Sequence, residues 1–254
     1  MRALRGVHDA FTWLTVLPLP QPRGDFDRRR GGTAISAVPL VGVVLGTLGA
    51  LIALGLSHTA LPTTLTGVIV VVFLALATRG MHLDGLADTA DGLGSYGDPD
   101  RVRTIMRSGD VGPFGAATLI LVILGQSLAF GALADDGRWW AVATVVFVGR
   151  ATVPVVCRRA LSAANADGFG ALVAGTQRWS VAVWSAIAIA AAVLVGLLDS
   201  PTAAVRAGVT VVVALGFAWA FSRHVSRRAG GVTGDVIGAT IELVTALTAV
   251  GLLL

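Results

Sequence analysis

Three aspartates in the stretch from residue 79 to 115 have the spacing of groups that could hold a metal ion. Asp84, Asp88 and Asp91 stand at positions i, i+4 and i+7, so on a helix they project from one face. Carboxylates this close repel one another, and a divalent cation between them would relieve the repulsion. Because carboxylate oxygens favour hard cations, the triad predicts a Mg²⁺ site rather than a merely solvated acidic loop.

The residues around this triad suit a ligand that carries phosphate. Arg103 and Arg107 are four residues apart, and Arg101 is within reach of the same side, so a basic surface follows the acidic one. Phosphate recognition uses this pairing, with a divalent ion on some oxygens and guanidinium groups on others. Gly85 and Gly92 would let a bulky ligand approach the backbone. The alternative role for the three arginines is to anchor the segment to anionic lipid.

A second acidic motif lies near the C-terminal end of the sequence. Asp235 and Glu242 are seven residues apart, and Glu242 is the only Glu and falls inside an apolar segment. Ionisable groups in such segments are costly and mark functional sites by default. We therefore expect both acids to contribute to the metal or substrate site, with pairing to an Arg as the alternative for Glu242. Asn165 and Asp167 are weaker candidates, divided evenly between substrate contact and turn formation.

The composition indicates that these side chains are positioned by helices in a membrane. The 254 residues are 55% hydrophobic and only 13% charged, and the mean hydropathy is +0.80. Soluble domains carry about 25% charged residues. A soluble enzyme, a disordered chain and a disulfide-stapled secreted domain are therefore excluded. The sequence predicts an all-α, polytopic helix bundle that is embedded in the lipid bilayer.

Apolar runs of about 20 residues predict about seven transmembrane helices. We expect them at roughly 35–56, 61–78, 113–134, 139–157, 180–198, 203–221 and 237–254. Residues 1–254 then form a single membrane domain. Within it, residues 1–33 are expected to lie at the membrane interface, and residues 79–112 to form a cytoplasmic loop that carries the catalytic groups.

The arginines predict how the chain is oriented. Sixteen of the 19 basic residues, all Arg, fall in the N-terminal segment and in the segments 79–112, 158–179 and 222–236. By the positive-inside rule these four segments and the N-terminus are cytoplasmic. A net charge of +4 then reports orientation rather than nucleic-acid binding. We expect a multi-pass protein of the bacterial inner membrane whose active site faces the cytoplasm, and the sequence leaves open whether it forms a homo-oligomer.

The two acidic motifs together resemble those of the cobalamin synthase family, the membrane adenosylcobinamide-GDP ribazoletransferases. The first is HLDGLADTADG at residues 82–92, followed by GDVGPFGA at 109–116, and the second is the TGD-x-x-GA-x-x-E pattern at 233–242. Weaker similarity extends to FTWLTVLPLP at 11–20, PLVGVVLG at 39–46 and ADGFGA at 166–171. The resemblance therefore covers nearly the whole chain in order.

This resemblance implies a Mg²⁺-dependent transferase of adenosylcobalamin biosynthesis. A hydroxyl of α-ribazole, or of its 5′-phosphate, would attack the cobinamide-bearing phosphorus of adenosylcobinamide-GDP, and GMP would leave. The metal would bind the Asp84–Asp88–Asp91 triad, Asp235 and Glu242 would complete this cluster or hold a second ion, and the three arginines would contact the GDP phosphates. His82 or one of the aspartates would accept the proton of the attacking hydroxyl.

Two other classes of membrane protein also use acidic residues in or beside a span. A membrane phosphotransferase of the CDP-alcohol type also holds its metal through an Asp-rich motif, but that motif places an Arg where this chain has Asp88. An ion-coupled transporter would also use intramembrane acids, but transporters tend to show duplicated halves, and no second copy of the Asp motif is present.

Overall fold

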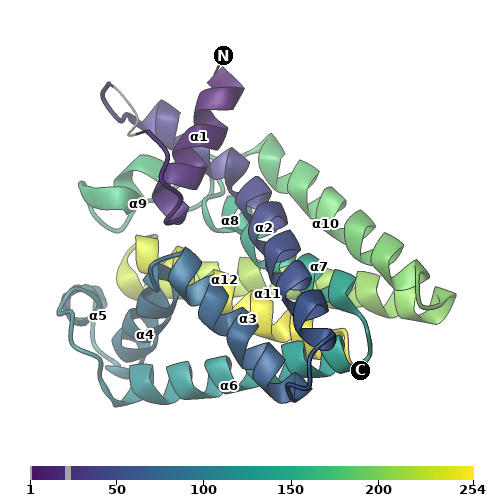
Figure 1. The fold of residues 1–254 in the computed structure, drawn as a ribbon. Helices are drawn as coiled ribbons and strands as arrows, with labels where there is room; N and C mark the ends of the chain where they lie inside the picture. The colour runs from purple at the N-terminus through teal and green to yellow at the C-terminus, as the bar shows by residue number, and fades with distance from the viewer. Residues whose placement is uncertain (1, 21–23) are drawn as a thin grey trace.

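The computed structural model describes residues 2–20 and 24–254, and the regular secondary structure of this part of the chain consists of helices and two isolated β-bridges. Residues 1 and 21–23, which belong to the predicted interfacial segment, lie outside the described residues. The helices are α1 (Arg2–Leu14), α2 (Arg28–Ser57), α3 (Thr63–Ala77), α4 (Met81–Gly94), α5 (Pro99–Met106), α6 (Pro113–Asp135), α7 (Trp139–Ala151), α8 (Val153–Val156), α9 (Gly168–Val173), α10 (Trp179–Leu197), α11 (Pro201–Ala229) and α12 (Gly234–Gly251) (Figure 1).

Six segments of the described chain are long and apolar enough to cross a membrane: α2, α6, α7 with α8, α10, α11 and α12. A seventh is obtained when α3 and α4 are taken together, and these two helices are bent by 92° relative to each other. The prediction of a multi-pass helical membrane protein with about seven spans is therefore confirmed.

The bend between α3 and α4 places the first acidic motif outside the six spans. Arg79 and Gly80 both adopt left-handed backbone conformations there, with φ of 56° and 69°. Glycine adopts this conformation without steric cost, and the turn lets α4 begin at Met81 in a new direction. The segment that the sequence presents as a loop, residues 79–112, thus contains two helices, α4 and α5.

Small residues allow close packing inside the bundle, while large apolar residues cover its outside. A Cβ atom at Gly42 would lie 2.8 Å from Cβ of Arg150 on α7, and one at Gly46 would lie 2.5 Å from the Ala143 carbonyl oxygen. Such close approach is the usual means of helix association in lipid. On the outer surface of α6, Ile120, Leu121, Leu124 and Leu128 are exposed, as expected for a face in contact with lipid tails.

Helix α12 lies inside the bundle and contacts α4, α6, α7 and α11 (Figure 1). Its side chains from Val236 to Glu242 are all buried. The second acidic motif is therefore carried by a central helix, and the first by a helix packed directly on it.

Candidate active site

Two glycines bring the acidic motifs of α4 and α12 together. A Cβ atom at Gly85 of α4 would lie 2.8 Å from Cα of Asp235, and one at Gly238 of α12 would lie 3.1 Å from Cα of His82. The two backbones can touch only because neither glycine has a side chain. Gly85 therefore accommodates helix α12 rather than a ligand, and Gly92 similarly accommodates Met106 of α5.

This contact creates a cluster of carboxylates from both motifs. Asp84 is exposed, and Asp88 and Asp235 are half-buried. Partial burial, together with the negative charges of Asp84, Asp235 and Asp91, raises the pKa of Asp88 to about 7. Among the described residues, no hydrogen bond or ion pair engages the carboxylates of Asp84 and Asp88. The cluster thus holds negative charge that a bound cation would neutralise.

The donor chemistry of this cluster suits Mg²⁺ when a substrate supplies further ligands. In the described part of the chain, no three side chains of His, Cys, Asp or Glu converge closely enough to enclose a metal ion. Mg²⁺ rarely needs such an enclosure, because it commonly binds one or two carboxylates, several waters and the phosphates of a substrate. Carboxylate oxygens from two members of the cluster, Asp88 and Asp235, fit that mode of binding.

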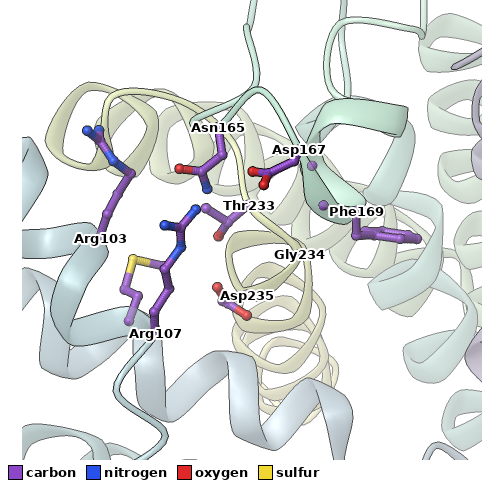
Figure 2. Close-up of a pocket in the computed structure, with 11 residues that line it drawn as sticks. Arg103, Arg107, Asn165, Asp167, Phe169, Thr233, Gly234 and Asp235 are labelled. Atoms are coloured by element: carbon purple, nitrogen blue, oxygen red, sulfur yellow. The ribbon is translucent and has the colours of Figure 1, made fainter.

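A pocket of about 310 Å³ lies beside the cluster and collects most of the predicted substrate-binding residues. Arg103 comes from α5 and Arg107 from the position directly after it, Asn165 and Asp167 come from the segment before α9, and Asp235 comes from the first turn of α12 (Figure 2). Five residues predicted from three separate parts of the sequence therefore line one pocket, with acidic and basic groups both present.

The three predicted arginines are placed differently around this pocket. Arg107 is exposed, and no hydrogen bond or ion pair occupies its guanidinium among the described residues. Arg103 donates a 2.8 Å hydrogen bond to the Ala229 carbonyl oxygen and pairs with Asp100. Arg101 is exposed and does not line the pocket, because residues two positions apart on a helix point to different sides. Arg107 is thus the arginine most available to a phosphate.

The segment before α9 is fixed against the start of α12 by backbone hydrogen bonds. The Ala164 amide donates to the Val232 carbonyl oxygen at 3.1 Å, and the Val232 amide donates to Ser162 at 2.8 Å. These bonds hold Asn165 and Asp167 opposite the first turn of α12, and Figure 2 shows their side chains beside Thr233. Their predicted role as substrate contacts is compatible with this position.

Asp91 contacts the start of helix α6. Its two carboxylate oxygens accept hydrogen bonds from the backbone amides of Gly112 and Gly115, at 2.7 and 2.9 Å. These amides lie at the N-terminus of α6, where unpaired donors and the helix dipole favour a negative charge. Asp91 is 7% exposed. The structure therefore shows Asp91 joining α4 to α6.

We expect the replacement of Asp91 by alanine to destabilise the fold by roughly 2–3 kcal/mol, because two buried backbone amides lose a charged acceptor. The measurement is the midpoint of thermal unfolding in detergent without divalent metal, which should fall by several degrees. Asp136, an exposed residue at the end of α6, provides the matched control, and its replacement by alanine should leave the midpoint unchanged. Equal midpoints for the two variants would contradict this structural role.

Glu242 lies apart from the carboxylate cluster, in a buried polar network. Its carboxylate and its carbonyl oxygen accept hydrogen bonds from the Gln126 amide of α6, at 2.8 and 3.0 Å. On its other side, Oε1 lies 3.7 Å from Nδ1 of His82, which is itself 3.4 Å from the Arg150 guanidinium. Polar groups inside apolar spans need such partners. The network therefore connects α4, α6, α7 and α12.

His82 belongs to this network through its contacts with Glu242 and Arg150, and it also lines a neighbouring cavity. The residue is 4% exposed. Burial and the positive charge of Arg150 lower the pKa of the imidazole well below its usual value. The ring is enclosed between Glu242 and Arg150, whereas the Asp84 carboxylate is exposed. The geometry therefore favours a carboxylate over His82 as the acceptor of a proton.

A comparison with protein-family models shows the family to which the chain belongs. The model described as cobalamin-5-phosphate synthase matches residues 6–253. The chain belongs to the cobalamin-5-phosphate synthase family. Curated relatives named adenosylcobinamide-GDP ribazoletransferase include proteins from Frankia casuarinae (41% identical, over 94% of this chain and 91% of the relative), Corynebacterium efficiens (38%, over 96% and 90%) and Klebsiella pneumoniae (35%, over 92% and 93%).

Membership of the cobalamin-5-phosphate synthase family confirms the resemblance drawn from the two acidic motifs, and it decides against the transporter and the CDP-alcohol phosphotransferase. No solved structure matches the chain.

Sequence reasoning missed several residues that surround the site. Trp13 of α1 and Phe169 of α9 line a second cavity next to the cluster. Gln126 and Arg150 form the partners of Glu242 and His82 inside the bundle. The last two carry a usable signal, since a polar side chain in an apolar span needs a partner. The two aromatic residues fall in the weakly similar segments 11–20 and 166–171, but nothing in the sequence of either segment indicates that the two rings meet.

Proposed function

We propose that the chain transfers the cobinamide-bearing phosphoryl group of adenosylcobinamide-GDP to α-ribazole or its 5′-phosphate, with GMP as the leaving group. The proposal rests on membership of the family and on one structural observation, the convergence of Asp84, Asp88 and Asp235 from two separate motifs beside an arginine-lined pocket. Phosphoryl transfer needs positioning and charge stabilisation, and both are available where these groups meet.

Mg²⁺ is the metal that this donor set would hold. Asp88 and Asp235 would bind it through carboxylate oxygens, the diphosphate of the substrate would supply further ligands, and Asp84 would remain unbound beside them. When bound, the ion would neutralise charge that develops on the diphosphate. Asp91 is left out of this set because its oxygens are hydrogen-bonded to α6, and Glu242 because it belongs to the buried network.

The protein side chains then have separate tasks in the transfer. Arg107, with Arg103 behind it, binds phosphate oxygens of the GDP group in the smaller pocket. A ribose hydroxyl of the acceptor attacks the cobinamide-bearing phosphorus, a new P–O bond forms, and the P–O bond to the GMP phosphate breaks. The proton of that hydroxyl passes to a carboxylate of the cluster, and Asp84 is the exposed one.

We place this site at the cytoplasmic face of the bacterial inner membrane. Apart from Ile237 and Gly238, the residues that line the two cavities come from the N-terminal segment and from the segments 79–112, 158–179 and 222–236. These are the four arginine-rich segments of the sequence, and the positive-inside rule assigns them to the cytoplasm.

The test of this function is GMP release from the purified protein in detergent or lipid. With both substrates and Mg²⁺ we expect release that depends on the presence of α-ribazole or its phosphate. Removing the divalent ion with a chelator should abolish release, and adding Mg²⁺ back should restore it. Release that is unchanged in the chelator would refute the metal requirement, and no release under any condition would refute the proposed activity.

A further inference from the structure

A second, larger cavity adjoins the carboxylate cluster and the pocket lined by Arg103 and Arg107. Its volume is about 500 Å³, and its walls come from α1, the α3–α4 bend, α4, α9 and α12. Phe169, Gly234 and Asp235 line both this cavity and the arginine-lined pocket. The two spaces are therefore neighbours, and Asp235 stands at their boundary.

One wall of this larger cavity is aromatic and apolar. Trp13 lines it from α1 and Phe169 from α9, and the two ring centroids are 5.2 Å apart in an edge-on arrangement. Leu14, Met81 and Ile237 supply further apolar surface. A planar aromatic group gains binding energy from such a wall, because it can stack on or pack against the rings. Among the described residues that line the pocket with Arg103 and Arg107, Phe169 is the single aromatic one.

The other wall of the cavity is acidic. Asp84 and Asp235 both line it, and Arg79 is the one arginine among its described lining residues. A ligand that binds here should therefore be apolar and aromatic at one end and should carry hydroxyl groups at the other, since carboxylates accept hydrogen bonds from hydroxyls. A free nucleoside with an apolar base has this chemistry.

Trp13 is held in place by contacts that fix α1 over the cavity. The Arg79 guanidinium donates a 2.9 Å hydrogen bond to the Trp13 carbonyl oxygen. Asp9, at 1% exposure, binds Arg30 of α2 through both oxygens, at 2.6 and 2.8 Å. On its outer side, the Trp13 ring packs against Phe26 with the centroids 3.9 Å apart. The aromatic wall is thus preformed rather than assembled by the ligand.

We propose that this cavity binds the acceptor nucleoside, with its aromatic base against Trp13 and Phe169 and its ribose toward Asp84 and Asp235. The inference rests on the proposed function and adds to it the location of the acceptor. It gives the predicted interfacial helix α1 a direct part in substrate recognition. It also places the acceptor and the GDP group on opposite sides of Asp235, so that the attacking hydroxyl and the phosphorus meet at the cluster.

The test measures KM for α-ribazole and KM for adenosylcobinamide-GDP separately in Trp13 variants. Replacing Trp13 by leucine keeps apolar volume beside Phe26 but removes the aromatic face. We expect KM for α-ribazole to rise on the order of tenfold to a hundredfold, the usual effect of losing one stacking partner, and KM for adenosylcobinamide-GDP to stay within about twofold. Trp13→Phe should keep most of the affinity. Trp140→Leu, at an exposed position at the start of α7, is the matched control.

Three outcomes distinguish the claims. A selective rise in KM for α-ribazole in Trp13→Leu supports the proposed cavity. Unchanged constants, or a rise only for adenosylcobinamide-GDP, overturn the cavity assignment while leaving the transferase activity established. If the wild-type protein releases no GMP, the proposed function fails, and the assignment of an acceptor site fails with it.

Discussion

Replacing Asp88 by asparagine is expected to lower kcat for GMP release a hundredfold or more. The asparagine side chain has nearly the same shape, but it lacks the charge that would hold a divalent cation against the diphosphate. Metal-ion charge stabilisation is worth several kcal/mol in the transition state, and each 1.36 kcal/mol is about tenfold in rate. The measurement is Mg²⁺-dependent GMP release at saturating concentrations of both substrates.

Asp136→Asn provides the control for this result, because Asp136 is exposed at the end of α6 and is far along the chain from the cluster. Its kcat should equal that of the wild type. The thermal midpoint of the Asp88→Asn protein should not fall, since removing one negative charge relieves repulsion from Asp84 and Asp235. A variant at position 88 with full activity would refute the role of the carboxylate cluster.

The second large effect is expected from a single methyl group at the contact between α4 and α12. Gly85→Ala would place Cβ 2.8 Å from both Cα and the carbonyl oxygen of Asp235, so one backbone must move. Overpacking of this kind costs about 1–3 kcal/mol, and a displacement near 1 Å at a catalytic cluster can cost about a hundredfold in rate. We expect kcat to fall tenfold to a hundredfold and the thermal midpoint to drop by several degrees.

Gly125→Ala on α6 separates this effect from a general property of helical glycines. A Cβ atom there would meet no atom within 4 Å. Alanine also favours the helix by about 1 kcal/mol relative to glycine, so stability should hold or rise and activity should be normal. Wild-type activity in Gly85→Ala would show that the two motifs do not depend on close backbone contact.

The membrane fold could be predicted from the sequence because each span depends on its own composition. The predicted spans at 113–134 and 180–198 correspond closely to α6 (Pro113–Asp135) and α10 (Trp179–Leu197). The bend of 92° after α3 could not be predicted in the same way. It depends on two left-handed residues, Arg79 and Gly80, and arginine shows no preference for that conformation.

The residues of the site could be predicted only in part, because spacing along one helix does not show which carboxylates lie together. Residues seven apart on a helix are separated by about 10.5 Å along its axis, whereas Mg²⁺ binds its ligands at about 2.1 Å. In the structure the Asp91 carboxylate instead accepts hydrogen bonds from the amides of Gly112 and Gly115, and the Glu242 carboxylate accepts one from Gln126. Spacing alone shows that such residues face the same way. The structure shows in addition that a second helix supplies Asp235 beside Asp88.

The partners of Asp91 and Trp13 could not be found from sequence patterns. Asp91 binds amides that lie 21 and 24 residues further along the chain, where Gly112 and Gly115 show no polar side chain that would indicate a contact. Trp13 and Phe169 are separated by more than half the chain, and only tertiary packing brings their rings together. The proximity of Arg103 and Arg107 could be predicted from the sequence, because residues four apart lie on the same side of a helix.

Locating a bound metal is the most direct test of the account. Crystals or particles of the full chain, prepared with Mn²⁺ in place of Mg²⁺ and with the GDP-bearing substrate, would show the ion by anomalous scattering or density. We predict a single main site between α4 and α12, contacted by Asp88 and Asp235 and by the substrate diphosphate. An ion bound instead at Asp91 or Glu242, or one that does not contact the diphosphate, would contradict the proposed active site.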